Sequence, residues 1–81
     1  MKHYKVTMNN QYEHYSMIIQ WSKPDNIYIL TVPELPGCKT HGATYEEALQ
    51  QGKDAIETWI EGSKALGLPI PEPRVLMTDI A

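Results

Sequence analysis

The sequence of 81 residues is short of several features that mark particular classes of function. Cys38 is its single cysteine, so no disulfide can form within the chain. Lysine and arginine are scattered without a basic block and the formal net charge is −3, which disfavours direct contact with nucleic-acid phosphates. No glycine-rich phosphate loop is present, and residues 1–15 contain no apolar run. We therefore expect neither a signal peptide nor a membrane span, and we predict a cytoplasmic protein.

The length predicts a single domain that covers residues 1–81. A chain this short buries a limited core, and oligomerisation is one usual remedy when disulfides are excluded. The acidic balance of the chain also suits a basic protein partner. Composition thus favours a small protein that associates, either with itself or with another protein.

Two segments in the first half have the pattern of antiparallel strands. In residues 13–21, apolar and polar side chains alternate over most of the segment. One face of this strand would carry Tyr15, Met17, Ile19 and Trp21. Residues 27–32 are rich in β-branched and aromatic side chains, and turn-forming residues at 22–26 separate the two segments. These observations predict a β-hairpin with a loop of several residues.

The next segment predicts a tight turn and a third strand. Pro36 and Gly37 take the two central positions of the turn, where proline presets the first φ and glycine accepts the positive φ of a type II turn. Pro33 has no N–H, so pairing of the second strand should fade there. Residues 38–41 are long enough for a short strand only, and Gly42 is expected to end it.

A helix is predicted from about residue 45 to Leu66. Thr44 and Glu47 form a capping box, in which each side chain accepts a hydrogen bond from a free backbone N–H at the helix start. Apolar or small residues recur at helical spacing and would form its packed face: Tyr45, Ala48, Leu49, Gly52, Ala55, Ile56, Trp59 and Ser63. Gly67 is a suitable stop. The prolines that follow predict an extended connection over 68–73.

The expected fold is α+β, with a three-stranded antiparallel sheet and one helix in the order β-β-β-α. An extra short strand is possible at 74–77, which could also be a tail, while 1–10 could be an edge strand or a loose arm. One helix covers only one face of a sheet. Ile18 interrupts the polar face of the first strand, and the second strand carries apolar residues on both sides. The uncovered face would then be an exposed apolar patch, a feature that marks partner sites.

A search for catalytic groups gives no convincing set. The carboxylates fall in turns, at a strand end or on the polar side of the helix, so none is held mid-strand on an apolar face where it could bind a metal rigidly. Cys38 and His41 supply two ligands where a zinc site needs four, and no third group orients them as a nucleophile pair. The aromatic residues lack the interleaved cations of a base-stacking surface and are interpreted as core or interface. The sequence therefore predicts no enzyme activity, no cofactor and no metal.

An ordered motif in the middle of the chain resembles the HicB family of antitoxin-like proteins. A strand runs into Val-Pro-Glu-Leu-Pro-Gly-Cys at 32–38, a Thr-His-Gly step follows at 40–42, and the helix begins with Thr-Tyr-Glu-Glu-Ala-Leu at 44–49. The resemblance covers about residues 12–73. It implies a partial ribonuclease-H-like fold without the catalytic carboxylates, a small basic ribonuclease toxin of the HicA type as the bound partner, and dimers or higher assemblies. Many members carry a DNA-binding domain after this region, whereas this sequence ends eight residues past Pro73, so direct DNA binding is not expected.

The leading hypothesis is an antitoxin that neutralises such an RNA-cleaving toxin by direct protein contact. From their expected exposure near the hairpin and turn ends, we predict six contact residues: Trp21, Asp25, Tyr28, Glu34, Leu35 and Pro36. An alternative is a solitary homo-oligomeric module without a toxin, which would use the second face of the sheet for self-association. A third hypothesis is a weak metal-dependent nuclease that uses the carboxylate positions of the ancestral fold.

Overall fold

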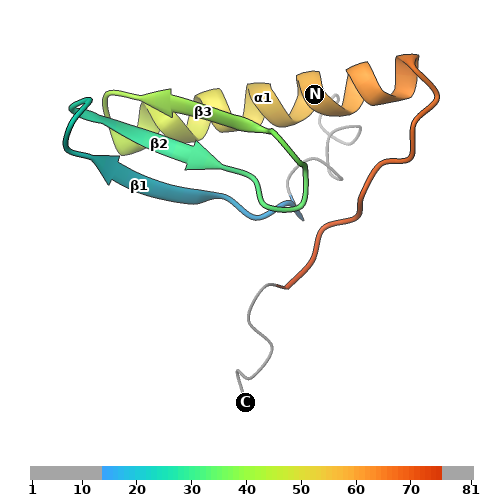
Figure 1. Ribbon diagram of the computed structural model, residues 1–81, viewed down its shortest axis with the longest axis horizontal. Coiled ribbons are helices and arrows are strands. Elements are labelled where there is room, and N and C mark those ends of the chain that lie inside the picture. Colours follow the sequence, from blue (N-terminus) through green and yellow to red (C-terminus); the bar gives the residue numbers. More distant parts are fainter. Residues whose placement is uncertain (1–13, 76–81) are drawn as a thin grey trace, which may run out of the picture.

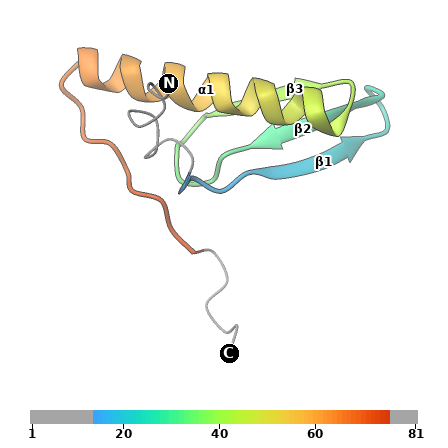
Figure 2. The same cartoon turned by 180° about the vertical axis from the view of Figure 1, so that it is seen from behind.

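The computed structural model describes residues 14–75, which fold as a three-stranded sheet with a helix on one face (Figure 1). The elements follow the order β1 (Ile18–Ser22), β2 (Ile27–Thr31), β3 (Lys39–Gly42) and α1 (Tyr45–Ala65). β2 is the central strand and pairs antiparallel with both neighbours. The helix runs from the hairpin end of the sheet toward the opposite end, as the view from behind also shows (Figure 2). This confirms the predicted α+β arrangement of three antiparallel strands followed by one helix.

The β1–β2 hairpin starts later than the alternation of its sequence predicts. Strand pairing begins at Ile18, which lies opposite Thr31, whereas the pattern predicts a strand from several residues earlier. The backbone N–H of Ser16 donates to the carboxylate of Glu34 at 3.1 Å. A side chain therefore holds this part of the chain in place of a strand ladder. The turn between the two strands lies at residues 23–26, within the predicted turn cluster.

Gly42 is the last residue of β3, which spans Lys39–Gly42 and so lies one residue later than the strand predicted at 38–41. Its Cα pairs with that of Tyr28 in β2. A Cβ atom at Gly42 would come within 2.4 Å of the backbone nitrogen of Ala48 in α1, so only glycine permits this close approach of helix and sheet. Gly52 acts in the same way, because a Cβ there would lie 2.7 Å from the Cδ1 methyl of Leu30. Gly52 thus lies on the packed face of α1, as its helical spacing predicts.

The turn after β2 has the predicted backbone signature. Gly37 has a φ of 80°, and the N–H of Cys38 donates to the carbonyl of Leu35 at 2.9 Å. The N–H of Val32 donates to the carbonyl of Cys38 at 3.0 Å, just beyond the ends of the paired strands. These bonds close the connection from β2 to β3 and direct the turn back toward the helix.

The helix α1 begins with the predicted capping box. The hydroxyl of Thr44 accepts a hydrogen bond from the N–H of Glu47 at 3.0 Å, while the carboxylate of Glu47 accepts from the N–H of Ala43 at 2.6 Å. Both bonds satisfy donors at a helix start that have no partner within the helix. The last helical residue is Ala65, one residue before the predicted end, and Gly67 follows with a φ of 71°.

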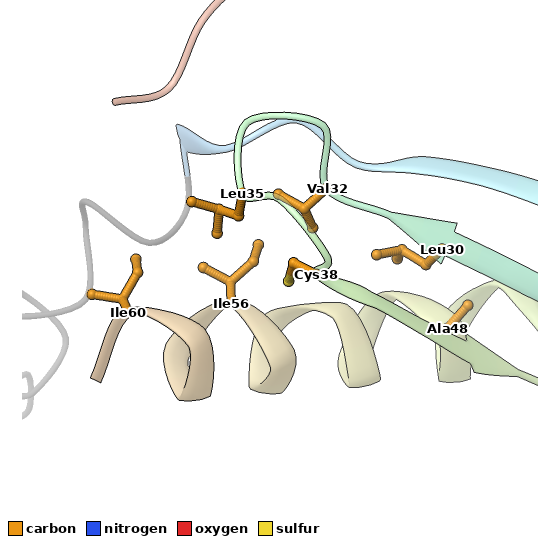
Figure 3. Packing of buried hydrophobic residues seen from close by; sticks show 7 residues of the cluster. All are labelled: Leu30, Val32, Leu35, Cys38, Ala48, Ile56 and Ile60. Atoms are coloured by element: carbon orange, nitrogen blue, oxygen red, sulfur yellow. The ribbon is translucent and has the colours of Figure 1, made fainter. Parts of the chain in front are cut away.

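The hydrophobic core lies between the sheet, the turn after β2 and α1. Its buried members are Leu30, Val32, Leu35, Cys38, Ala48, Ile56 and Ile60 (Figure 3). Tyr45 and Leu49 belong to the predicted packed face of the helix but are 59% and 42% exposed, whereas Ile60, which the prediction omitted, is buried. The helix packs mainly on β3 and β2, so the side chains that it presents toward β1 are only partly covered.

The chain after the helix returns toward the turn after β2. Residues 68–75 form no helix or strand, as their prolines predict. The hydroxyl of Tyr15 donates to the carbonyl of Pro71 at 2.5 Å, and the N–H of Arg74 donates to the carboxylate of Glu34 at 3.0 Å. Three segments that are distant in the sequence are thus joined at this end of the molecule.

The structure decides only part of the predictions for the two ends of the chain. Arg74 and Val75 lie outside any strand, which argues against a fourth strand that starts at residue 74. Residues 76 and 77 of that predicted segment lie outside the described residues. The same holds for the edge strand or arm predicted at 1–10.

Candidate partner-binding surface

The six predicted contact residues fall at two opposite ends of the sheet. The β1–β2 hairpin end carries Trp21, Asp25 and Tyr28, and the turn after β2 carries Glu34, Leu35 and Pro36. The structure brings together the residues within each group but separates the two groups, because β2 runs from one end of the sheet to the other (Figure 1).

Three aromatic rings from three different elements meet at the hairpin end. We call them the aromatic cluster: Trp21 of β1, Tyr28 of β2 and Tyr45 of α1. Trp21 and Tyr28 are paired directly across the hairpin, and their ring centroids are 4.9 Å apart at an interplanar angle of 66°. The centroids of Tyr28 and Tyr45 are 4.3 Å apart and their planes are inclined by 31°. Because such ring pairs contribute about 0.5–1.5 kcal/mol beyond burial, we expect the cluster to be ordered before any partner binds.

The aromatic cluster is open to solvent on its outer side. Trp21 is 50% exposed and Tyr45 is 59% exposed. The flank of α1 that faces β3 carries Gln51, which lines a shallow cleft together with Lys39. Leu49 precedes Gln51 by two positions, or about 200° of helix rotation, and so lies on the flank away from β3. Leu49 is also 42% exposed and extends the cluster along the helix as apolar surface.

Acidic side chains border the aromatic cluster. Burial raises the pKa of the Tyr28 phenol above its usual value, and a hydrogen bond with Tyr45 and the negative charge of Glu46 raise this pKa further. Asp25 is exposed in the hairpin loop, where its carboxylate accepts a hydrogen bond from the hydroxyl of Ser22 at 3.3 Å. This end of the molecule therefore combines aromatic surface with negative charge.

Glu34 lies in a different environment from the one predicted. Its side chain is 4% exposed, and its carboxylate accepts hydrogen bonds from the N–H of Ser16 at 3.1 Å, the hydroxyl of Ser16 at 2.9 Å and the N–H of Arg74 at 3.0 Å. Burial alone would raise the pKa of this carboxyl, but the hydrogen bonds outweigh burial and hold the pKa below its usual value. We call this arrangement the Glu34 clamp, because it joins the segment before β1, the turn after β2 and the C-terminal segment.

The expectation of exposure is wrong for Glu34 and Leu35. Leu35 is 0% exposed and belongs to the hydrophobic core, because it lies on the side of the turn that faces Ile56 and Ile60 of α1 (Figure 3). Pro36 is exposed as expected, and its carbonyl accepts a hydrogen bond from the indole N–H of Trp59 at 2.9 Å. Glu34 and Leu35 thus support the fold and offer no surface to a partner.

Tyr45 is the member of the aromatic cluster that the predicted contacts omit. Its helical spacing assigns it to the packed face of α1, and its ring does contact Tyr28 of β2, yet it is the first residue of the helix and stays 59% exposed. One signal in the sequence indicates its place. The capping box at Thr44 fixes where the helix begins, and the return of the chain along β3 brings that point to the hairpin end of the sheet.

The described residues hold no evident catalytic or metal site. Between residues 14 and 75, no group of three or more histidine, cysteine, aspartate or glutamate side chains could bind a metal ion. Cys38 is buried in the core whereas His41 is exposed, and burial raises the pKa of the Cys38 thiol, which makes the thiolate scarcer. Within the same part of the chain, no helix has the length and apolar character needed to cross a membrane.

The face of the sheet away from α1 carries isoleucine side chains. Leu30 is buried against the helix, so alternation along β2 places Ile27 and Ile29 on the other face. Ile18, paired with Thr31, lies on this same face and is 41% exposed. No helix in the described range covers this face, which is partly apolar as the sequence predicts.

Residues 14–75 thus define a small α+β unit with an exposed aromatic cluster at one end and a buried carboxylate at the other. A family model described as the HicB-like antitoxin of bacterial toxin-antitoxin systems matches residues 15–81. The chain belongs to this family. The family description points to an antitoxin role, in which the partner is a toxin in general terms.

Several relatives support this assignment. A UPF0150 protein of Thermoplasma acidophilum is 44% identical over 57 residues, which cover 70% of this chain and 81% of the relative. A UPF0150 protein of Synechocystis is 31% identical over 71 residues, or 88% of this chain and 89% of the relative. An uncharacterised 14.9 kDa protein of Haemophilus phage HP1 is 42% identical over 40 residues, or 49% of this chain and 30% of its own length. The predicted resemblance to a short HicB-like protein is confirmed.

Proposed function

We propose that the chain is an antitoxin that neutralises a small, basic, RNA-cleaving toxin of the HicA type by direct protein-protein contact. It would act in the cytoplasm as a single domain over residues 1–81, without catalysis, cofactor or direct DNA binding. Membership of the HicB-like antitoxin family supports the general role. The net charge of −3 suits a basic partner.

The exposed aromatic cluster is the observation that carries the choice of surface. Tryptophan and tyrosine are enriched among the residues that dominate protein-protein affinity. Trp21 and Tyr45, the two outer rings of the cluster, are 50% and 59% exposed, and a contiguous exposed apolar patch marks an interaction site. Asp25 and Glu46 add negative charge at the same end, which opposes nucleic-acid phosphates and attracts a basic protein.

The proposed contact set follows from this surface. Trp21, Asp25 and Tyr28 remain in it, and Tyr45 joins them because it completes the cluster. Pro36 remains exposed but lies at the other end of the sheet, so it would contact only a partner that spans the molecule.

The experiment is a pull-down of the tagged chain co-expressed with the small open reading frame next to its gene. The proposal expects a stable complex with a basic ribonuclease-like protein, which the substitution Trp21→Ala weakens at least tenfold. Leu66→Ala is the matched control, because Leu66 is 75% exposed at the far end of α1. Failure of the neighbouring protein to bind the wild-type chain would refute the proposed function.

A solitary homo-oligomer is the second candidate function. The observation in its favour is the partly apolar open face of the sheet around Ile18, Ile27 and Ile29. Light scattering at micromolar concentration tests it, with Ile18→Lys as the disruptive variant. A wild-type chain that is strictly monomeric would exclude this function, and an oligomer that Ile18→Lys dissociates would support it.

A further inference from the structure

We propose that the aromatic cluster is a receptor for a cationic side chain, an arginine of the partner, which stacks on the open ring surface of the cluster with Glu46 as its counter-charge. This inference rests on the proposed function and names the chemistry of the contact. It concerns the side chain that the surface selects, whereas the proposed function concerns only the existence of a toxin complex.

The rings have the chemistry that a cation requires. The face of an aromatic ring is the negative part of its quadrupole, and a cation within about 6 Å of the ring centroid is attracted to it. Tyr28 lies between the other two rings and contacts both, with centroid distances of 4.9 Å to Trp21 and 4.3 Å to Tyr45. Each outer ring is held by Tyr28 on one side and is about half exposed, so ring surface remains open for a ligand.

The charges around the cluster favour a cation over other ligands that stack. Glu46 is exposed, acts on Tyr28 through its negative charge, and forms no ion pair with any residue of the described range. Asp25 adds a second exposed carboxylate at the hairpin tip. Lys23, Lys39 and Lys53 are the lysines nearest in sequence to these groups, and they come from the hairpin loop, β3 and α1, so they form no basic cluster that would attract phosphates. A nucleobase with its phosphates is therefore disfavoured.

Arginine is preferred to lysine for a geometric reason. A guanidinium is planar, is weakly hydrated and stacks on an aromatic face while its edge donates hydrogen bonds to a carboxylate. Tyr45 and Glu46 are consecutive residues in the first turn of α1, so ring surface and a carboxylate are available from the same turn. Lysine could use the charge but not the stacking.

The consequence for neutralisation is direct. A protein that cleaves RNA must hold phosphates with arginine and lysine side chains. An arginine bound in the aromatic cluster is unavailable to RNA, and the toxin would lose substrate contact without any change at its catalytic residues. The cluster would thus compete with RNA for the same cation.

The first test titrates the full chain with three peptides and follows the ring protons by NMR. The peptides are glycyl-arginyl-glycine, its lysine analogue and its citrulline analogue, in which the guanidinium is replaced by a neutral group of nearly the same shape. We expect saturable shifts at Trp21, Tyr28 and Tyr45 with arginine, smaller shifts with lysine and none with citrulline. Trp59 is the internal control, because it is the second tryptophan and bonds to Pro36 at the other end of the sheet. Equal shifts with citrulline, or no shifts at the cluster, would overturn the inference.

The second test measures the dissociation constant of the toxin complex for three variants. Trp21→Leu and Glu46→Gln should weaken binding at least tenfold and about threefold, while Tyr45→Phe, which keeps the ring, should change it less than about threefold. Far-UV circular dichroism verifies that each variant is folded. A complex whose affinity is unchanged in Trp21→Leu and Glu46→Gln would refute this inference alone. If no complex forms with the wild-type chain, the proposed function fails, and with it the assignment of the arginine to a toxin.

Discussion

The two ends of the sheet carry the same kinds of residues in opposite states. At the hairpin end, Trp21 and Glu46 are exposed. At the turn end, Leu35 is fully buried and Glu34 is 4% exposed with its carboxylate saturated by hydrogen bonds. The hairpin end therefore presents exposed groups that a partner can bind. The groups at the turn end are already buried or hydrogen-bonded within the fold.

The comparison shows that residue type does not decide whether a side chain is available to a partner. A buried carboxylate must be paired, and the Glu34 clamp pairs it with donors from both flanking segments. An exposed carboxylate beside aromatic rings needs no partner within the chain. Substitutions at the turn end should therefore lower the stability of the protein, whereas substitutions at the hairpin end should lower its affinity for a partner.

The largest expected effect is the loss of core packing at the turn end. Leu35→Ala leaves a cavity between the sheet and α1 and should lower the free energy of unfolding by about 2–5 kcal/mol. Urea denaturation followed by circular dichroism measures this change. Leu66→Ala is the same chemical change at a site that is 75% exposed, and it should cost less than about 0.5 kcal/mol. An equal loss of unfolding free energy in the two variants would show that Leu35 contributes no more to stability than an exposed leucine.

The next effect concerns the Glu34 clamp and its dependence on pH. Glu34→Gln replaces one acceptor oxygen by an NH₂ group and should cost about 1.5–3 kcal/mol near neutral pH, the range for hydrogen bonds to a charged group. The folded pKa of Glu34 lies below its usual value near 4.5, so the stability due to its charge is present above that pH and is lost as pH falls through the folded pKa.

Urea denaturation at several pH values measures this effect. The wild-type chain should lose more stability than the Glu34→Gln variant as the pH is lowered below about 4.5. Glu57→Gln, at an exposed position on α1, is the control and should follow the wild-type curve. Parallel pH curves for the wild type and Glu34→Gln would show that the clamp carries no charge-dependent stability.

A smaller effect is expected at the start of the helix, which positions Tyr45. Thr44→Ala removes the hydroxyl that accepts from the N–H of Glu47 and should cost about 1 kcal/mol. Thermal unfolding measures the loss, and Thr58→Ala at an exposed position inside the helix is the control. If the helix cap positions Tyr45, Thr44→Ala should also shift the ring signals of Tyr28 in NMR spectra. Unchanged signals would show that the cap does not position the aromatic cluster.

The smallest effect is the coupling within the aromatic cluster. A double-mutant cycle with Trp21→Leu and Tyr28→Leu should give a coupling energy of about 0.5–1.5 kcal/mol, as expected for two rings in edge-to-face contact. Urea denaturation of the two single variants and the double variant supplies the cycle. A coupling near zero would mean that the rings are not held together before a partner binds.

Local patterns predicted the elements of this fold well. The capping box fixed the start of α1, and Gly37 takes the positive φ that its place in the turn predicts. The predictions were less accurate at residues where one element contacts another. Gly42 was expected to stop the strand, yet it pairs with Tyr28 as the last residue of β3, and α1 comes so close there that a Cβ atom would clash with Ala48.

The candidate site was also predictable only in part, because local patterns give the face of a strand but not the contacts between distant segments. Trp21 and Tyr28 share a face by the register of the hairpin, which alternation and loop length indicate. The burial of Glu34 could not be read from its neighbours in sequence, because its donors are Ser16 and Arg74, 18 and 40 positions away.

By itself the sequence determined the strands, the turn, the capped helix and the family, because backbone preferences and hydrophobic spacing act over a few residues. The tertiary structure alone decided which residues of these elements are surface. It buried Leu35, saturated the carboxylate of Glu34 and joined Tyr45 to the hairpin aromatics. The physical reason is that the exposure and the hydrogen-bond partners of a side chain depend on which distant segments come into contact. Only the packing of α1 and the C-terminal segment on the sheet determines those contacts.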